Sequence, residues 1–265
     1  MPTFNEAPET VRASLHSLVA QSFKDFECIV VDDSTIAECA DACRAFCLTD
    51  ARFIYIHPIK RLGLSSSSNL GLEMARGRLI ARFDSDDLCM PDRLALQVEF
   101  LDANPQVFVL GGALEIIDEY GQTMSFRDYP LASVDVAKGM HFTTTIAQPT
   151  VMFRRELIAA YGCYNPAFPF SEDLDLWLRW LNAGVVFANL PQVLVRYRQS
   201  NTRRVTRHWR YNLRARVCNF AGTDVLRRIA GISCIAFWAV LPNAVQEFVF
   251  RALILRHKRR SGDFT

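Results

Sequence analysis

The chain has 265 residues, of which 50% are apolar and 22% are charged, and its formal net charge is +2. This composition is ordinary for a globular protein and excludes a disordered or low-complexity chain, and the length suits one large domain with or without an appendage. The eight cysteines form no CxxC pair and no zinc spacing with histidine. Because no secretory signal follows Met1 either, we expect reduced thiols in a cytoplasmic protein.

The charge is unevenly distributed along the chain. Residues 196–265 hold 15 Lys/Arg and 3 Asp/Glu, a balance of +12, whereas residues 1–195 hold 15 basic and 25 acidic residues, a balance of −10. An acidic body therefore carries a basic tail. Nucleic acid is not expected as a partner, because the body of the protein would repel it.

The first 110 residues alternate short apolar runs with helical patterns. The apolar runs predict strands at 26–31, 52–57 and 78–83. The helical patterns predict helices at 9–21, 36–47, 66–76 and 91–104. Pro91 would stand in the first turn of the last of these, and Cys39, Cys43 and Cys47 would share a core-facing side of the second. This alternation predicts βαβ units and a parallel sheet, which binds ligands at the carboxyl ends of its strands.

Acidic residues directly follow two of these predicted strands. Asp32 and Asp33 follow the first, and Asp84, Asp86 and Asp87 follow the third. Like charges this close resist ionising together, so a cation among them would be stabilising. Mg²⁺ and Mn²⁺ prefer carboxylate oxygens, with substrate phosphates completing the shell. The pattern predicts a metal–diphosphate site, and the alternative is a solvated acidic turn.

After residue 105 the pattern changes. Residues 107–118 predict strand, turn and strand, and residues 148–157 predict a strand that runs into a helix. Residues 171–184 predict a helix that Ser171 caps and Gly184 closes, with acids in its first turn. Two final strands are expected at 185–191 and 193–198.

Five stretches in this order resemble the family 2 inverting glycosyltransferases with a GT-A fold, of the bacterial cell-envelope polysaccharide type. They are MPTFNE, VVDDST, GLSSSSNLGLEMARGRLIARFDSDDLCMPDRL, QPTVMFRREL and SEDLDLWLR. The resemblance implies an α/β, Rossmann-like domain whose mostly parallel twisted sheet is flanked by helices. This GT-A domain would span 1–198, with a nucleotide-binding half at 1–105 and an acceptor half at 106–198. A helical tail, basic and apolar, would follow at 199–265.

The resemblance also implies the residues of the site. The nucleotide sugar would contact Thr3, Phe4, Glu6, Asp32 and Asp84. Asp86, with help from Asp84, would hold Mn²⁺ or Mg²⁺, which acts as a Lewis acid on the diphosphate leaving group. Asp173 would be the catalytic base toward the acceptor hydroxyl, and its neighbour Glu172 would bind the acceptor. The implied reaction moves a sugar from a nucleotide-diphosphate sugar to a saccharide or lipid-linked acceptor in polysaccharide or lipopolysaccharide synthesis.

Each implied role has a structural alternative. Phe4 is equally expected in the core, and Asp32 is alternatively a turn acceptor. Glu6, Glu172 and Asp173 are alternatively first-turn helix acids, each worth less than about 1 kcal/mol. The backbone of Thr3 is expected to matter more than its side chain.

Four neighbouring residues are expected to be structural. Asp87 would orient the acidic turn or cap the following helix, and Asp175 would be a solvated helix residue. Trp177 and Trp180, at helical spacing, are expected in the core.

The sequence departs from the family pattern in three places. The chain begins almost at the end of the family's first strand, Ser68 stands where many relatives have a basic residue, and Gln199 stands where many have histidine. Arg61 or Arg82 is a candidate substitute for the basic residue. These departures motivate an alternative: a non-catalytic or impaired relative that binds nucleotide or glycan, with a truncated first strand. A third interpretation is a Rossmann-type dinucleotide oxidoreductase, since acids follow strands there too, but the absence of any GxGxxG after the first strand argues strongly against it.

The tail combines arginines with apolar runs. Residues 203–216 hold six arginines, and the apolar run at 229–241 is too short to span a bilayer. EFVFRALIL and RHKRR follow it. We expect peripheral contact with the inner face of the cytoplasmic membrane, where arginines meet anionic head groups. The alternatives are a broken hairpin in the membrane, a helical pair packed on the domain, or a dimer interface.

Overall fold

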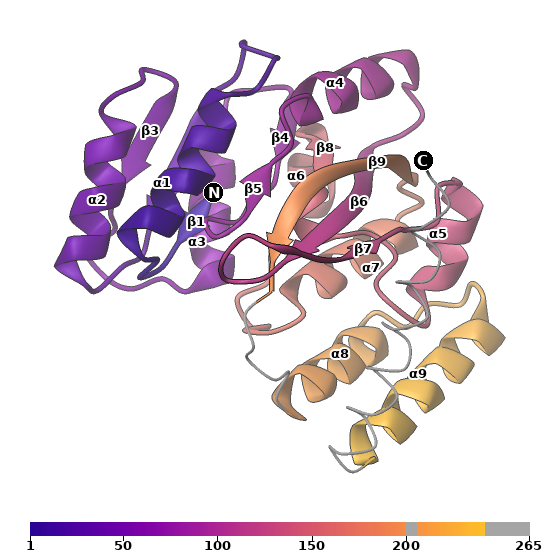
Figure 1. The fold of residues 1–265 in the computed structure, drawn as a ribbon. Helices are drawn as coiled ribbons and strands as arrows, with labels where there is room; N and C mark the ends of the chain where they lie inside the picture. The colour runs from indigo at the N-terminus through magenta and orange to yellow at the C-terminus, as the bar shows by residue number, and fades with distance from the viewer. Residues whose placement is uncertain (200–205, 242–265) are drawn as a thin grey trace.

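The computed structural model describes residues 1–199 and 206–241. Two sheets lie beside each other (Figure 1), one with three strands and one with six. Helices flank both, so the predicted α/β fold with a parallel sheet and covering helices is confirmed.

The three-stranded sheet is parallel throughout and has the order β1-β2-β3. Its strands are β1 (Pro2–Thr3), β2 (Cys28–Asp32) and β3 (Phe53–Ile56). The helices that follow these strands in the sequence are α1 (Pro8–Val19), α2 (Ala37–Cys47) and α3 (Leu64–Met74). Thr3 lies opposite Asp32, so two predicted nucleotide-binding residues share one sheet edge.

The six-stranded sheet is mixed and has the order β4-β8-β6-β9-β5, with β7 on β6. Its strands are β4 (Leu79–Ala81), β5 (Leu88–Cys89), β6 (Val109–Ile117), β7 (Thr123–Arg127), β8 (Met152–Arg154) and β9 (Phe187–Arg198). Only the pair β6·β9 is parallel. The predicted strand at 78–83 therefore exists as β4, but it pairs antiparallel with β8 instead of joining the first sheet. The second sheet takes strands from both sides of residue 105, and the division into halves there stays a prediction.

Two strand predictions in the second half were wrong. Residues 109–117 form one strand, because Gly111 and Gly112 are not a turn but points of close packing. A Cβ at Gly111 would overlap Asn189 and Ile146, and one at Gly112 would overlap Leu194. The two final strands are also one strand, β9, whose register on β6 shifts. This shift accommodates Pro191, which cannot donate to the ladder.

The remaining helices are α4 (Arg93–Ala103), α5 (Ser133–Met140), α6 (Glu156–Tyr161) and α7 (Glu172–Asn182), with a 3₁₀ turn, η1, at Gln148–Thr150. Pro91 lies before α4 instead of in its first turn. Ser171 precedes α7 in a left-handed conformation with φ 57°, and its side chain caps nothing, contrary to the predicted N-cap. Gly184 follows α7 with φ +81°, as a closing glycine should.

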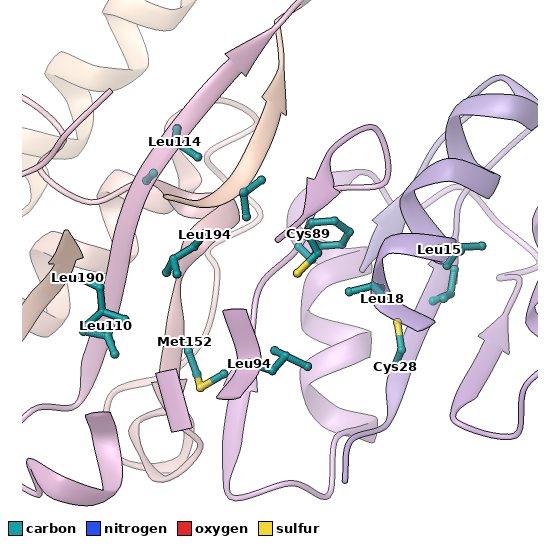
Figure 2. Packing of buried hydrophobic residues seen from close by; sticks show 14 of the residues in the cluster. Leu15, Leu18, Cys28, Cys89, Leu94, Leu110, Leu114, Met152, Leu190 and Leu194 are labelled. Atoms are coloured by element: carbon teal, nitrogen blue, oxygen red, sulfur yellow. The ribbon is translucent and has the colours of Figure 1, made fainter. Parts of the chain in front are cut away.

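One apolar core joins the two sheets (Figure 2). It runs from Leu15 and Leu18 on α1 and Cys28 on β2, through Cys89 and Leu94, to Leu110, Leu114, Leu190 and Leu194. The three cysteines of α2 are buried, as predicted. Because both sheets are packed on the same core, the strand ends that carry the acidic residues have fixed relative positions.

The described part of the tail forms α8 (Thr206–Cys218) and α9 (Val225–Val240). Helix α8 packs on α7, and α9 packs on α8, so this part is a helical pair packed on the domain. No helix within residues 1–199 and 206–241 is both long and apolar enough to cross a membrane. Arg203, Arg204, EFVFRALIL and RHKRR lie outside the described residues.

Candidate active site

The edge shared by β1 and β2 holds the predicted nucleotide-binding residues. Asp32 is fully buried; its Oδ1 accepts a hydrogen bond from the Ser34 N–H at 3.0 Å and its Oδ2 accepts one from the Tyr55 hydroxyl at 2.8 Å. Thr3 is buried, and its carbonyl accepts from the Asp33 N–H at 2.9 Å. The backbone of Thr3 therefore helps to shape the turn that carries Asp32 and Asp33.

Phe4 is not a core residue. Its side chain is 39% exposed, and the Arg61 guanidinium lies 4.2 Å from the ring centroid. Arg61 is itself mostly exposed and reaches Asp33 only at 4.0 Å. Phe4 and Arg61 thus form an exposed aromatic–cation pair at the edge where a nucleotide is expected, and Arg61 stays available to an anionic ligand.

Asp33, to which no role was assigned, shapes the same edge. Its Oδ1 accepts from the Leu62 N–H and its Oδ2 from the Gly63 N–H, both at 2.7 Å. Gly63 has φ +78°, which only glycine adopts without strain. The partners lie about thirty residues away in sequence, so no local pattern could have identified them.

The acidic turn after β4 concentrates negative charge. The Asp84 carboxylate is paired with the Arg82 guanidinium at 2.6 Å. Burial, together with Asp84, raises the pKa of Asp86 to about 6. Burial and its interactions with Asp86 and Asp84 raise the pKa of Glu6 to about 7. The structure therefore brings Glu6, Asp84 and Asp86 close enough for their charges to interact and leaves their negative charge only partly compensated.

Arg198, at the end of β9, fixes this turn. Its N–H donates to Asp87 Oδ1 at 2.8 Å, and its guanidinium donates to the carbonyls of Asp86, Asp118 and Glu119 at 3.0, 3.2 and 2.7 Å. Asp87 is buried and accepts this hydrogen bond from Arg198, so it orients the turn. The residue before α4 is Asp92, so Asp87 does not cap that helix. Sequence reasoning missed Arg198, because its partners on the turn lie more than a hundred residues away.

Glu172 and Asp173 begin α7, which is predicted to face the acceptor. Glu172 is buried, and its Oε1 accepts from Gln148 Nε2 at 3.4 Å. Burial and the neighbouring Asp173 raise the pKa of Glu172 to about 7. Asp173 is half-buried, and its Oδ1 accepts from the Leu174 N–H at 2.7 Å. A partly protonated acid beside a carboxylate can both bind a hydroxyl and accept its proton.

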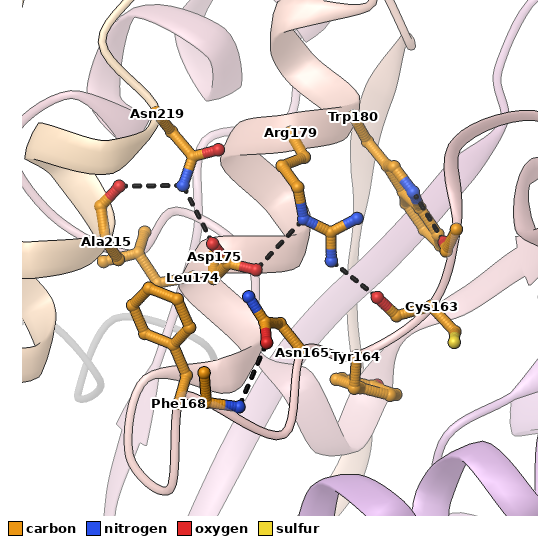
Figure 3. A network of polar contacts seen from close by, with 12 residues as sticks. Cys163, Tyr164, Asn165, Phe168, Leu174, Asp175, Arg179, Trp180, Ala215 and Asn219 are labelled. Atoms are coloured by element: carbon orange, nitrogen blue, oxygen red, sulfur yellow. Dashed lines mark hydrogen bonds and ion pairs between the residues drawn. The ribbon is translucent and has the colours of Figure 1, made fainter.

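Asp175 is not a solvated helix residue (Figure 3). It is 3% exposed, and its carboxylate accepts from Arg179 Nε at 3.0 Å and from Asn219 Nδ2 at 2.9 Å. The prediction failed because Asn219 lies on the tail, 44 residues away. Trp177 and Trp180 are fully buried in the second core cluster, as predicted.

The residues present fit a divalent cation that shares its shell with phosphates. No group of three His, Cys, Asp or Glu within the described parts of the chain could hold a metal alone. Asp84 and Asp86 supply hard oxygen atoms. Burial and the charge of Asp84 raise the pKa of Asp86, and a cation between the two carboxylates would favour their ionised form. The side chain of Gln199 is exposed, and Ser68 is buried on α3 and so is no replacement for a basic phosphate ligand.

Residues 1–162 match the sequence model of the family described as Glycosyl transferase family 2. This chain belongs to that family. The glycosyltransferase is 30% identical over 207 residues to the amylovoran biosynthesis glycosyltransferase AmsE of Erwinia amylovora, covering 78% of this chain and 77% of AmsE. It is 31% identical over 194 residues to the O-antigen biosynthesis glycosyltransferase WbnJ of Escherichia coli, covering 72% and 75%.

Solved structures support the GT-A fold of this glycosyltransferase. The mannosyltransferase PcManGT of Pyrobaculum calidifontis, in complex with GDP-Man and Mn²⁺, has a TM-score of 0.64 at 18% identity, over 98% of this chain and 80% of that one. S. aureus TarS 1-349 in complex with UDP has a TM-score of 0.66 at 16% identity, over 92% and 75%. None of these comparisons favours the alternative of a non-catalytic relative.

Proposed function

We propose that this glycosyltransferase transfers a sugar with inversion from a nucleotide-diphosphate sugar and requires Mn²⁺ or Mg²⁺. The observation that carries the proposal is the gathering of Glu6, Asp84 and Asp86, whose charges are incompletely compensated, at an edge where Phe4 and Asp32 also lie. PcManGT, which was solved with GDP-Man and Mn²⁺, and TarS, which was solved with UDP, share the fold.

Each residue has a defined task in this mechanism. Asp86 and Asp84 would hold the cation, which supplies Lewis-acid assistance to the diphosphate leaving group. Asp32 and the backbone of Thr3 would orient the base and ribose, with Phe4 against the base. Asp173 accepts the acceptor's hydroxyl proton while that oxygen attacks the anomeric carbon, and Glu172 hydrogen-bonds the same acceptor.

The acceptor we propose is a saccharide or a lipid-linked saccharide of a cell-envelope polysaccharide. AmsE and WbnJ are named for amylovoran and O-antigen biosynthesis. The tail supports a place at the inner face of the cytoplasmic membrane, because α9 exposes Leu226, Ile229, Phe237 and Val240 in a part of the chain rich in arginine.

Thermal unfolding with nucleotides tests the donor site. UDP, GDP, dTDP and CDP are each added with and without Mn²⁺ to the wild type, Asp86→Ala, Asp173→Asn and Asp41→Asn, an exposed control on α2. A nucleotide at 100 times its Kd stabilises the fold by about 2.7 kcal/mol. We expect a Mn²⁺-dependent rise in Tm with one nucleotide, lost in Asp86→Ala and kept in the other two variants.

A measurement of sugar transfer distinguishes the proposed role of Asp173 as base from nucleotide binding at the donor site. Asp173→Asn should bind the nucleotide normally and lose transfer by a factor of about 10² to 10⁴, because it cannot accept a proton. A folded wild type whose Tm no nucleotide raises, or transfer that Asp173→Asn leaves unchanged, would contradict the proposed function.

A further inference from the structure

A buried guanidinium is paired with Asp84, one of the proposed donor-side carboxylates. Arg82, directly after β4, is only 6% exposed; its Nη2 donates to Asp84 Oδ1 at 2.6 Å and its Nη1 to the Phe83 carbonyl at 2.5 Å. Its Nε makes no hydrogen bond within the described residues. Its positive charge also acts on Glu172 and favours the charged form of that carboxyl.

The backbone ties Arg82 to the acceptor side as well. Its N–H donates to the Val151 carbonyl at 2.8 Å, and its own carbonyl accepts from Arg93 Nη2 at 2.7 Å. Val151 directly follows η1, which carries Gln148, the residue that donates to Glu172. The end of β4 and the start of α7 are therefore connected through the η1–β8 segment.

A purely structural explanation fits these contacts poorly. Burying a cation is costly, and replacing a buried ion pair by apolar side chains is often neutral or stabilising. The Nε of Arg82 is unpaired, and one carboxylate and one carbonyl satisfy only part of its guanidinium. Burying such an arginine costs more free energy than burying an apolar side chain of similar size. The same charge is useful where two groups of carboxylates must stay close to each other.

We propose that Arg82 is a positioning residue that holds Asp84 on the donor side and supplies the positive charge facing Glu172 on the acceptor side. The donor and acceptor roles rest on the proposed function, whereas the electrostatic link does not. Without this charge, Asp84 loses its partner, and repulsion among the remaining carboxylates is no longer offset.

The first test compares Arg82→Met, which removes the charge, with Arg82→Lys, which keeps it. Arg154→Met is the matched control, because Arg154 is half-buried on β8, its guanidinium donates to the carbonyls of Leu101, Asn104 and Val107, and it lies 5.7 Å from the centroid of the Phe108 ring. We expect Arg82→Met to raise the Kd for Mn²⁺ in the presence of UDP or GDP at least tenfold, because losing the fixed position of Asp84 should outweigh the stronger attraction that removing a positive charge gives to a cation. Arg82→Lys should recover most of that loss. The control should lower the Tm and leave the Kd unchanged, and a similar profile for Arg82→Met would overturn the proposal.

The second test needs no substrate. The groups that act on Glu172 are Asp173, Arg82, Tyr164 and Gln148. Removal of Arg82 leaves Asp173 as the charged neighbour among these groups, so Glu172→Gln should stabilise the Arg82→Met protein more than the wild type at pH 8. We expect the increase in the folding equilibrium constant to be at least about tenfold larger in the Arg82→Met background, equivalent to one pKa unit.

The two tests separate the two proposals. Equal effects of Glu172→Gln in both backgrounds would overturn the role of Arg82, even if nucleotide and Mn²⁺ bind as proposed. Conversely, coupling between Arg82 and Glu172 in a protein that binds no nucleotide would contradict the proposed donor site alone. If Arg82→Met does not fold, Arg82→Gln, which keeps hydrogen-bond donors without the charge, takes its place in the cycle.

Discussion

At the scale of single residues, the site contains carboxyl groups whose charged form is made unfavourable by burial. Glu172 illustrates this, because burial and Asp173 raise its pKa to about 7 from an ordinary value near 4.5. The folded protein therefore binds more protons than the unfolded chain between those two values. The stability that Glu172 contributes is fully present below about pH 4.5 and is lost as the pH rises through 7.

Replacing Glu172 by glutamine should accordingly stabilise the protein at pH 8 and have little effect at pH 4.5. The gain is at most about 3 kcal/mol, since one pKa unit corresponds to 1.36 kcal/mol. Urea unfolding of the wild type and Glu172→Gln at both pH values measures it, with Glu9→Gln on the exposed surface of α1 as the control. A variant destabilised at pH 8 would mean that the Glu172 carboxylate is fully charged and well paired in the fold.

The residues that could be predicted from sequence are those whose position follows from a neighbouring strand or helix. Asp84 and Asp86 lie within five residues of the end of β4, and Glu172 and Asp173 begin α7, so a local pattern was sufficient. The contacts of Arg198 with the turn and of Asp175 with Asn219 join residues at least 44 positions apart, which periodicity does not encode. Long-range polar contacts, rather than the acidic motifs, are therefore what the structure adds.

At the scale of elements, glycine accounts for both a wrong strand prediction and the attachment of the tail. Gly111 and Gly112 resemble a turn in sequence, yet they allow β6 to approach its neighbours within a continuous strand. Gly231 has the same task on α9. A Cβ there would overlap the His141 carbonyl, which the Arg216 guanidinium also contacts at 2.6 Å.

We predict that Gly231→Ala loosens α9. Alanine normally favours a helix by about 1 kcal/mol over glycine, but here the overlap should outweigh that gain and cost about 1–3 kcal/mol. Faster amide hydrogen exchange along α9, together with a lower Tm, measures the effect. Gly222→Ala is the matched control, because a Cβ at Gly222 meets no atom within 4 Å. Unchanged exchange in Gly231→Ala would show that α9 is not held by this close approach.

At the scale of the whole molecule, α9 has one face fixed to the domain and one face open. Arg228, Gly231 and Ile235 are buried, and Arg228 donates to Asn182 Oδ1 at 2.6 Å and to the Asn219 carbonyl at 3.0 Å. On the opposite side the exposed ridge consists of Leu226, Ile229, Phe237 and Val240, with exposed fractions of 83%, 50%, 66% and 78%. At 3.6 residues per turn, the ridge falls within an arc of roughly 80°.

This ridge should bind anionic membranes. Residues 196–265 carry a balance of +12 on an otherwise acidic protein, so attraction to anionic lipid would turn the ridge toward the bilayer. We expect the wild type to co-sediment with vesicles that contain phosphatidylglycerol at low salt, and less at high salt. The double variant Leu226→Ser/Phe237→Ser should bind at least about tenfold more weakly, since each apolar side chain contributes about 1.5–3 kcal/mol when fully buried.

The control is the double variant Leu48→Ser/Ile59→Ser, which removes two strongly exposed apolar side chains from residues 1–105. It should bind vesicles like the wild type, because neither residue belongs to the tail. If the wild type ignores the vesicles, the membrane contact is wrong. If the ridge variant instead changes the oligomeric state in the absence of lipid, the ridge is an interface between copies of the chain. If both double variants weaken vesicle binding equally, the charge of the tail attracts the protein to the membrane and the apolar ridge of α9 has no specific part in binding.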